Sequence, residues 1–171
     1  MMPMKESIRF TASLDNFSKT SSTCVVILAM GLLISPLVFP QIGGLTGTMF
    51  AGIFLSLLSL FFYLRQPIAY TVSPGGITVE KRCGSLEIPA HTILQTKPLP
   101  REDTAAVIRT FGNGGLFGYT GRYHHQKTGS MLWQCTRRSG CIEIIRAGKL
   151  PMVISPDQAD RFLDASRLFR R

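Results

Sequence analysis

The most informative pattern in the chain is a stretch of 45 residues, Thr20–Leu64, that contains no Asp, Glu, Lys or Arg. It consists of two apolar runs, Thr23–Phe39 and Leu45–Leu64, separated by Pro40–Gly44. A helix needs about 20 apolar residues to cross the hydrocarbon core of a bilayer. Eleven residues of the second run are Leu, Ile or Phe, which favour insertion. The pattern predicts a hairpin of two membrane-spanning helices, at residues 23–39 and 45–64.

Two other interpretations of these runs are less consistent with the sequence. A secretory signal peptide would lie nearer the N-terminus, and it would leave the second run in place. A soluble domain of this length would have difficulty covering two helices that are apolar on all sides. Neither run contains an ionisable residue, which argues against a proton relay, an ion pathway or a transporter.

Small residues recur every four positions along the second run. They are Gly44, Thr48, Gly52 and Ser56. Such rows let helices approach closely in lipid. Two interpretations are open, namely packing against the first helix of the hairpin and a homodimer contact, and packing within the hairpin is the simpler one.

After Gln66 the pattern changes to short β-rich runs punctuated by turns. Ser73–Gly76 is a turn signal, and Ile77–Lys81 alternates apolar and polar residues like a half-buried strand. Further strands are expected at 68–72, 86–88, 93–97, 105–111, 119–124, 131–136, 141–146 and 150–154. Several short strands with regular turns predict an antiparallel sandwich or a small barrel over residues 66–171.

The C-terminal segment returns to helical spacing. Ser155 is the expected N-cap, Pro156 the first helical residue, Asp157 a partner of the positive end of the helix dipole, and Gln158 the closing member of a capping box. The sequence therefore predicts one amphipathic helix of about twelve residues, long enough to cover an open end of a barrel.

The order of these motifs resembles that of the bacterial pleckstrin-homology-like (PH-like) domain family. The resemblance covers residues 66–169, and the residues that carry it are 70–77, 86–89 with Ile93, 112–121, and 153–157 with Phe162. Two membrane helices ahead of the domain are also similar to a common arrangement in that family. The resemblance implies two nearly orthogonal sheets with one capping helix. It implies neither a reaction nor an assigned ligand.

Residues 1–22 precede the hairpin and are mostly polar. Within them, Ile8–Leu14 alternates in the manner of a strand and could pair with the open edge of the domain's sheet. A disordered or interfacial tail is an equally open interpretation.

The distribution of charge predicts the orientation of the hairpin. The chain carries a net charge of +9, and residues 65–171 hold sixteen basic and eight acidic side chains. Positively charged flanks tend to remain in the cytoplasm. We therefore expect a multi-pass protein of the cytoplasmic membrane with both termini in the cytoplasm.

No motif for catalysis, nucleotide binding or metal binding is present. Gly112–Gly118 lacks the spacing of a dinucleotide-binding loop and is better explained as a wide turn. The adjacent His124 and His125 would point to opposite faces of a strand, so they cannot easily share one ion with Cys135 or Cys141. We expect no cofactor, no metal and no enzyme activity.

Basic and aromatic residues cluster in the predicted loops. The candidate contacts with an anionic surface are Arg122, His124, His125, Lys127, Arg137 and Arg138. The adjacent Leu116 and Phe117 are candidates for insertion between lipid headgroups. Each Lys or Arg close to an anionic leaflet contributes about 1 kcal/mol of attraction. The alternative is that the charges form a solvated face and that Phe117 belongs to the core.

The sequence favours a non-catalytic, membrane-anchored binding or scaffolding module. Its first candidate ligand is an unidentified protein partner, recognised by strand addition at an open sheet edge. The alternative is an anionic lipid headgroup bound by the basic loops, and an enzyme of unknown type is a distant third class. Nucleic acid is not expected, because no nucleic-acid-binding motif is present.

Overall fold

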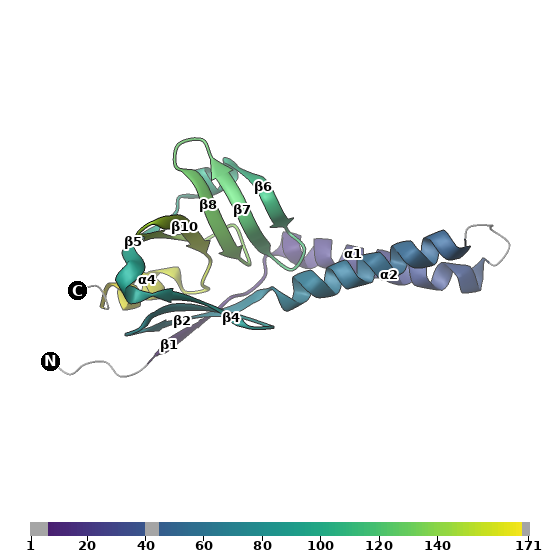
Figure 1. The fold of residues 1–171 in the computed structure, drawn as a ribbon, viewed down its shortest axis with the longest axis horizontal. Coiled ribbons are helices and arrows are strands. Elements are labelled where there is room, and N and C mark those ends of the chain that lie inside the picture. The colour runs from purple at the N-terminus through teal and green to yellow at the C-terminus, as the bar shows by residue number, and fades with distance from the viewer. Residues whose placement is uncertain (1–6, 40–44, 169–171) are drawn as a thin grey trace.

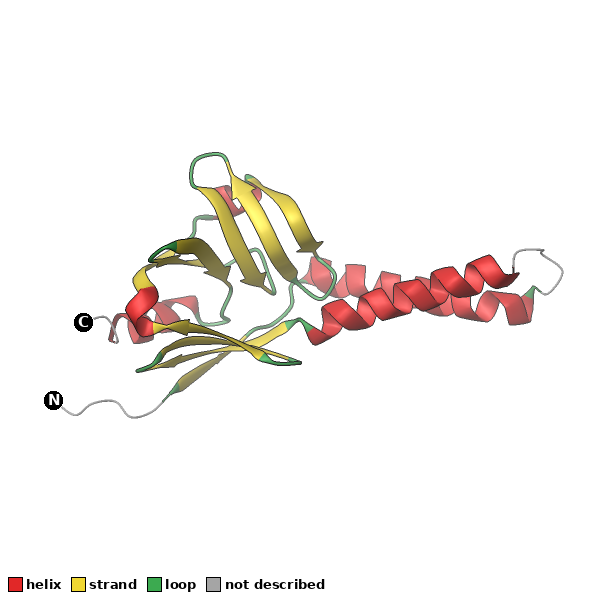
Figure 2. Cartoon of the chain, viewed as in Figure 1, coloured by secondary structure: helices red, strands yellow, loops and turns green. Residues whose placement is uncertain are grey.

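The computed structural model describes residues 7–39 and 45–168 and places a long helical hairpin at one end of a two-sheet β-structure (Figure 1, Figure 2). The hairpin consists of α1 (Asn16–Val38) and α2 (Leu45–Leu64). The predicted turn at Pro40–Gly44 lies outside the described residues. Both helices extend away from the sheets, and no strand packs along their outer part (Figure 1).

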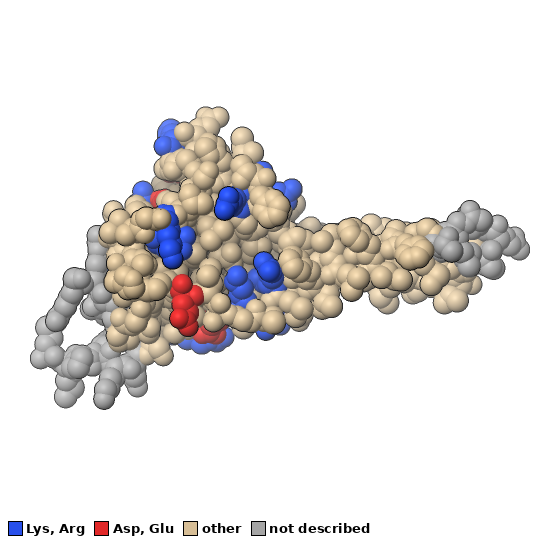
Figure 3. All heavy atoms as spheres, in the orientation of Figure 1, with Lys and Arg blue, Asp and Glu red and all other residues tan. Residues whose placement is uncertain are grey.

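The two helices are candidate membrane spans by length and composition. Their most apolar stretches have mean hydropathy values of 2.1 and 1.9, and only 11% of the residues in each stretch are buried. Large apolar side chains such as Leu37 and Phe50 face outward along the whole hairpin. An exposed apolar surface of this extent is typical of membrane or protein contact. On the face shown in Figure 3, the outer part of the hairpin carries no charged side chain, whereas Lys and Arg lie over the sheets.

The first helix begins before the predicted residue 23. The Asp15 side chain caps it, because its Oδ1 accepts the backbone N–H of Ser18 at 2.8 Å. The first turns of α1 are therefore polar and lie beside the sheets. Further along the hairpin, Gly52 lies against α1, where an added Cβ would be 3.0 Å from Leu33. This contact is of the kind expected for packing between α1 and α2.

A four-stranded sheet joins the segments on the two sides of the hairpin. Its order is β1 (Ile8–Thr11), β2 (Pro67–Ser73), β3 (Gly76–Lys81) and β4 (Ser85–Pro89). β1 pairs antiparallel with β2, from Ile8 opposite Val72 to Thr11 opposite Ala69. The N-terminal segment, for which a strand and a tail were both open, thus forms a strand. The chain before α1 and the chain after α2 lie on the same side of the hairpin.

A six-stranded sheet contains the remaining strands. In spatial order they are β5 (Ile93–Pro98), β9 (Ile142–Arg146), β10 (Lys149–Ile154), β8 (Gly129–Cys135), β7 (Tyr119–His125) and β6 (Val107–Gly114). Two short helices, η1 (Ala90–Thr92) and α3 (Arg101–Ala105), lie in the connections before and after β5.

The sheet arrangement differs from the expectation of a purely antiparallel fold in one pair. β10 runs parallel to β8, with Val153 opposite Trp133. After β8 the chain crosses over β10's position to form β9 first. The β9–β10 hairpin then places β10 between β9 and β8, where it runs parallel to β8. The two sheets remain separate, so the domain is a sandwich and not a closed barrel.

The main core lies between the two sheets and the C-terminal helix α4 (Ala159–Leu168). Phe162 of α4 is fully buried and meets Phe10 of β1 edge to face, with ring centroids 5.2 Å apart. Tyr70 of β2 crosses the space between the sheets, and its hydroxyl donates to the backbone carbonyl of Gln134 in β8 at 2.7 Å. A second cluster covers the other face of the six-stranded sheet, where Tyr123 stacks on Trp133.

The predicted cap of the C-terminal helix is wrong in detail. α4 begins at Ala159, and the carbonyl of Gln158 accepts the N–H of Phe162 at 3.0 Å. The Ser155 hydroxyl instead accepts the backbone N–H of Thr136 at 2.9 Å. Pro156 precedes the helix and belongs to no helix or strand. The Ser155 hydroxyl, which the local sequence pattern assigns to the helix N-terminus, is therefore used by the backbone of Thr136, directly after β8.

Asp157, the third residue of the predicted cap, connects the chain after β1 to the segment that precedes α4. Its carboxylate accepts the Thr11 hydroxyl at 2.7 Å and the Ser13 hydroxyl at 2.8 Å, and it forms an ion pair with Arg137 at 3.0 Å. Partial burial alone would raise the pKa of Asp157. The hydrogen bonds from Thr11 and Ser13 and the charge of Arg137 outweigh that effect and hold the pKa below its ordinary value.

Replacing Phe10 by Ala should destabilise the protein by about 3–5 kcal/mol, because it leaves a cavity against Phe162. The free energy of unfolding is measured by chemical denaturation of the full-length protein in detergent micelles. Arg9→Ala is the control on the same strand. Its exposed ion pair with Glu80, at 2.8 Å, contributes at most about 1 kcal/mol. Equal losses for the two variants would contradict the role of β1 in the core.

Acid should weaken the contact made by Asp157. A carboxyl group whose pKa is lower in the folded state contributes stability above its unfolded value of about 3.9, and that contribution is lost as the pH falls through the folded value. The free energy of unfolding should therefore fall more steeply below about pH 4 in the wild type than in Asp157→Asn. Parallel pH profiles for the two proteins would contradict this assignment.

Candidate functional site

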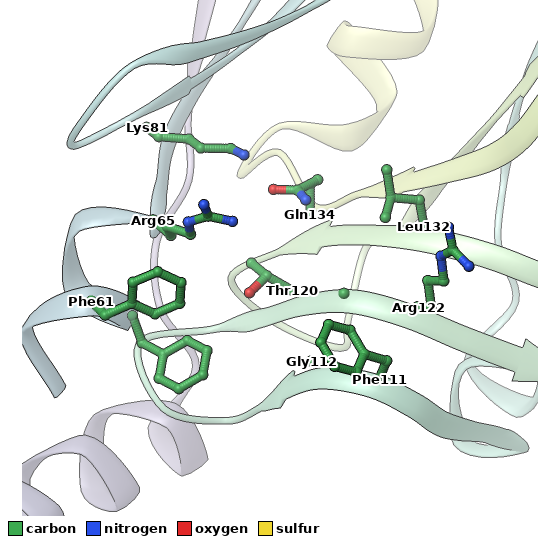
Figure 4. A pocket seen from close by; sticks show the side chains of 11 residues that line it. Phe61, Arg65, Lys81, Phe111, Gly112, Thr120, Arg122, Leu132 and Gln134 are labelled. Carbon is green, nitrogen blue, oxygen red and sulfur yellow. The ribbon is translucent and has the colours of Figure 1, made fainter. Parts of the chain in front are cut away.

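A cleft lies between the two sheets at the base of the hairpin. Its volume is about 450 Å³, within the range typical of small-molecule sites. The end of α2, the end of β3 and the strands β6, β7 and β8 form its walls (Figure 4). The lining residues are Phe61, Phe62, Arg65, Lys81, Phe111, Gly112, Thr120, Gly121, Arg122, Leu132 and Gln134.

Three cations from three different elements line the cleft. Arg65 directly follows α2, Lys81 ends β3, and Arg122 lies on β7. None of the lining residues is acidic. Within residues 7–39 and 45–168, the ion pairs involve other side chains, so these three cations have no carboxylate partner. The guanidinium of Arg65 instead lies 4.7 Å from the centroid of the Phe61 ring.

The electrostatics of Lys81 reflect this unbalanced charge. Burial in the cleft lowers the pKa of Lys81, and repulsion from the neighbouring Arg65 lowers it further. Both effects disfavour the charged form of the amine. A bound anion would reverse the second effect, so the cleft is complementary to negative charge.

Backbone forms part of the wall on the side of β6 and β7. Gly112 and Gly121 are opposite each other in the register of the two strands, and both have positive φ, 118° and 133°. A Cβ at Gly121 would collide with the carbonyl of Phe111, and one at Gly112 with the carbonyl of Thr120. The two strands therefore approach at a distance that only glycine permits.

The predicted membrane-insertion residues lie in the β6–β7 loop, which packs on the base of the hairpin. The backbone N–H of Phe117 donates to the Ser22 hydroxyl of α1 at 2.8 Å, and the Phe117 ring lies 5.4 Å from that of Tyr63 in α2. Leu116 and Phe117 are both half-buried. The loop thus has a packing role, and the insertion of either side chain between headgroups stays a prediction.

The predicted anionic-surface residues are not brought together by the fold. Arg122 is the only one of them that lines the cleft. His124 is exposed, and Lys127 lies in the β7–β8 turn, at the opposite end of these strands from the hairpin (Figure 1). His125 is buried, with its Nε2 3.7 Å from Asp103.

The remaining two predicted cations have structural partners. Arg137 pairs with Asp157, and its guanidinium also donates to the carbonyl of Pro156. Arg138 lies over the Tyr119 ring, 5.0 Å from its centroid.

Neither Arg65 nor Lys81 was among the predicted contacts with an anionic surface. Lys81 ends an alternating strand in the same phase as the apolar Ile77 and Val79. The clue available in the sequence was the position of Arg65 at the membrane boundary. Across the described residues, no three His, Cys, Asp or Glu side chains gather into a group that could hold a metal ion.

Two separate sheets packed face to face, with one C-terminal helix against them, define the class of PH-like folds, which are generally non-catalytic binding modules. The family model for the bacterial PH domain matches residues 68–168, and the chain belongs to this family. No curated protein and no solved structure matched the chain.

Proposed function

We propose that this protein is a membrane-anchored binding module that recognises a phosphate-type anionic group in the cleft between its two sheets. The observation that carries the proposal is the convergence of Arg65, Lys81 and Arg122 on a cleft without acidic residues. Hydrogen bonds to charged groups contribute about 1.5–3 kcal/mol each, and more than one of these cations can contact the same phosphate.

The hairpin localises this site at a membrane surface. α1 and α2 cross the cytoplasmic membrane, and the pairing of β1 with β2 keeps both flanks on one side. The basic surplus of residues 65–171 favours the cytoplasmic side. Arg65 then emerges at the level of the lipid phosphates, and the cleft opens next to them.

A second candidate function is recognition of a protein partner by strand addition. β6 is an edge of the six-stranded sheet, and it exposes Ile108 and Phe111, at 63% and 77%. An exposed edge with apolar side chains is suited to pairing with an extended peptide. Such binding would fail in Ile108→Glu and survive the loss of the cleft cations.

The anion proposal is tested by the stabilisation that inorganic phosphate gives to the full-length protein in a neutral detergent. Phosphate replaces chloride at constant ionic strength, and Tm is recorded. A ligand that binds the folded state raises Tm as its concentration increases. In Lys81→Gln/Arg122→Gln the phosphate concentration needed for the same rise should increase at least about tenfold.

The matched control is Lys127→Gln/Lys149→Gln, which removes the same charge from exposed positions outside the cleft. Its response should equal that of the wild type. The proposal is wrong if phosphate does not raise the wild-type Tm, or if the control loses as much of the response as the cleft variant.

A further inference from the structure

The cleft is amphipathic. Phe61 and Phe62, from the last turns of α2, form an apolar wall beside the hairpin, and the three cations lie on the other walls. Figure 4 shows Phe61 next to Arg65 with Lys81 near them, and Arg122 on the other side of the cleft beside Leu132. A free inorganic anion would contact the cations and would have no apolar part to lie against the aromatic wall. A molecule that joins an anionic group to an apolar chain would use both.

Gln134 indicates a second property of the ligand, namely a hydrogen-bond donor. The side chain is 8% exposed and lines the cleft, and its Oε1 has no hydrogen-bond partner among the described residues. In Figure 4 its amide extends into the space between Lys81, Arg65 and Thr120. The last torsion of a Gln side chain rotates readily, so the amide can present its oxygen to a ligand. A phosphate ester carries no donor for that oxygen, whereas a hydroxyl group does.

We infer that the cleft holds the headgroup of an anionic phospholipid that bears hydroxyl groups, of the phosphatidylglycerol class, drawn from the adjacent leaflet. The phosphate lies between Arg65, Lys81 and Arg122, a headgroup hydroxyl donates to Gln134, and the acyl chains remain beside the end of α2. This inference rests on the proposed anion-binding function and specifies its ligand.

The site is composite, since α2 and both sheets supply its walls. The fragment that begins at residue 66 lacks Arg65, both phenylalanines and the paired strand β1. A test of lipid binding must therefore use the full-length chain.

The experiment is a competition among lipids, read by native mass spectrometry of the full-length protein released from neutral detergent micelles. The micelles contain equal amounts of phosphatidylglycerol, phosphatidylmethanol and phosphatidylcholine. Phosphatidylmethanol has the same phosphodiester charge as phosphatidylglycerol but no headgroup hydroxyl. The wild type should retain phosphatidylglycerol about tenfold better than phosphatidylmethanol, and phosphatidylcholine least.

Variants separate the two parts of the recognition. Gln134→Leu should equalise phosphatidylglycerol and phosphatidylmethanol while keeping the preference for both over phosphatidylcholine. Lys81→Gln/Arg122→Gln should lose the preference for anionic lipids, and Lys127→Gln/Lys149→Gln should behave like the wild type. Gln134→Glu keeps the length of the side chain and should repel both anionic lipids. Each variant is first shown to unfold cooperatively, so that loss of lipid is not loss of fold.

The outcomes distinguish the lipid inference from the proposed anion-binding function on which it rests. Equal retention of the two anionic lipids by the wild type would overturn the inference. Displacement of the lipid by excess soluble glycerol phosphate would overturn it too, because the apolar wall would then contribute nothing. Stabilisation by inorganic phosphate without any retained lipid would also overturn it and leave the anion site intact. Loss of both responses would overturn the two together.

Discussion

The pairing of β1 with β2 is the constraint on which the rest of the structure depends. These strands flank the hairpin in the chain, and their register requires both ends of the hairpin to return to the same sheet. A strand formed by residues 8–11 alone would have no stability, and its stabilisation comes from β2 and from the contact of Phe10 with Phe162. The helical hairpin and the sheets are therefore one folding unit. The family match at residues 68–168 covers most of the β-structure but omits this first strand.

The same constraint creates the cleft. With the base of the hairpin fixed to the four-stranded sheet, the end of α2 lies opposite β6 and β7, and the β6–β7 loop packs on both helices. Arg65 then lines the same cleft as Lys81 and Arg122. Burial of Lys81 and, after it, repulsion from Arg65 disfavour the charged amine, as the lowered pKa of Lys81 indicates. Such an arrangement is favourable when an anion occupies it, which is why the cleft has the character of a binding site.

Much of the fold was predictable from the sequence, because the relevant signals are local. The absence of charge between residues 20 and 64 indicated two apolar helices, and alternation with turn residues located the strands. The order of the motifs predicted the bacterial PH family, which the family model confirms. The predictions that were wrong concern residues whose tertiary contacts override the local sequence pattern. Ser155 has the local pattern of a helix cap, but the end of β8 takes its hydroxyl. The parallel pairing of β8 and β10 depends on where a hairpin inserts, which no local pattern specifies.

The candidate site was less predictable for the same reason. Basic residues close together in sequence, such as Lys127, Arg137 and Arg138, looked like one surface, but the fold separates them and gives Arg137 and Arg138 structural partners. The cations that line the cleft come from a helix end and two different sheets. Arg65 and Lys81 are brought together by the β2–β3 hairpin, in which Pro67 pairs with Lys81. The position of Arg122 in the same cleft depends instead on how the two sheets pack, and it could not be derived from spacing along the chain.

Hydrogen exchange of the full-length protein in nanodiscs tests the pairing of β1 with β2 most directly. Backbone amides of residues 8–11 that face β2 should exchange far more slowly than those of an unstructured peptide, with protection approaching that of β2. Exchange of residues 8–11 at the unstructured rate, with residues 67–73 still protected, would contradict the account. The N-terminal segment would then be a free tail, and α1 would not be tied to the four-stranded sheet through β1.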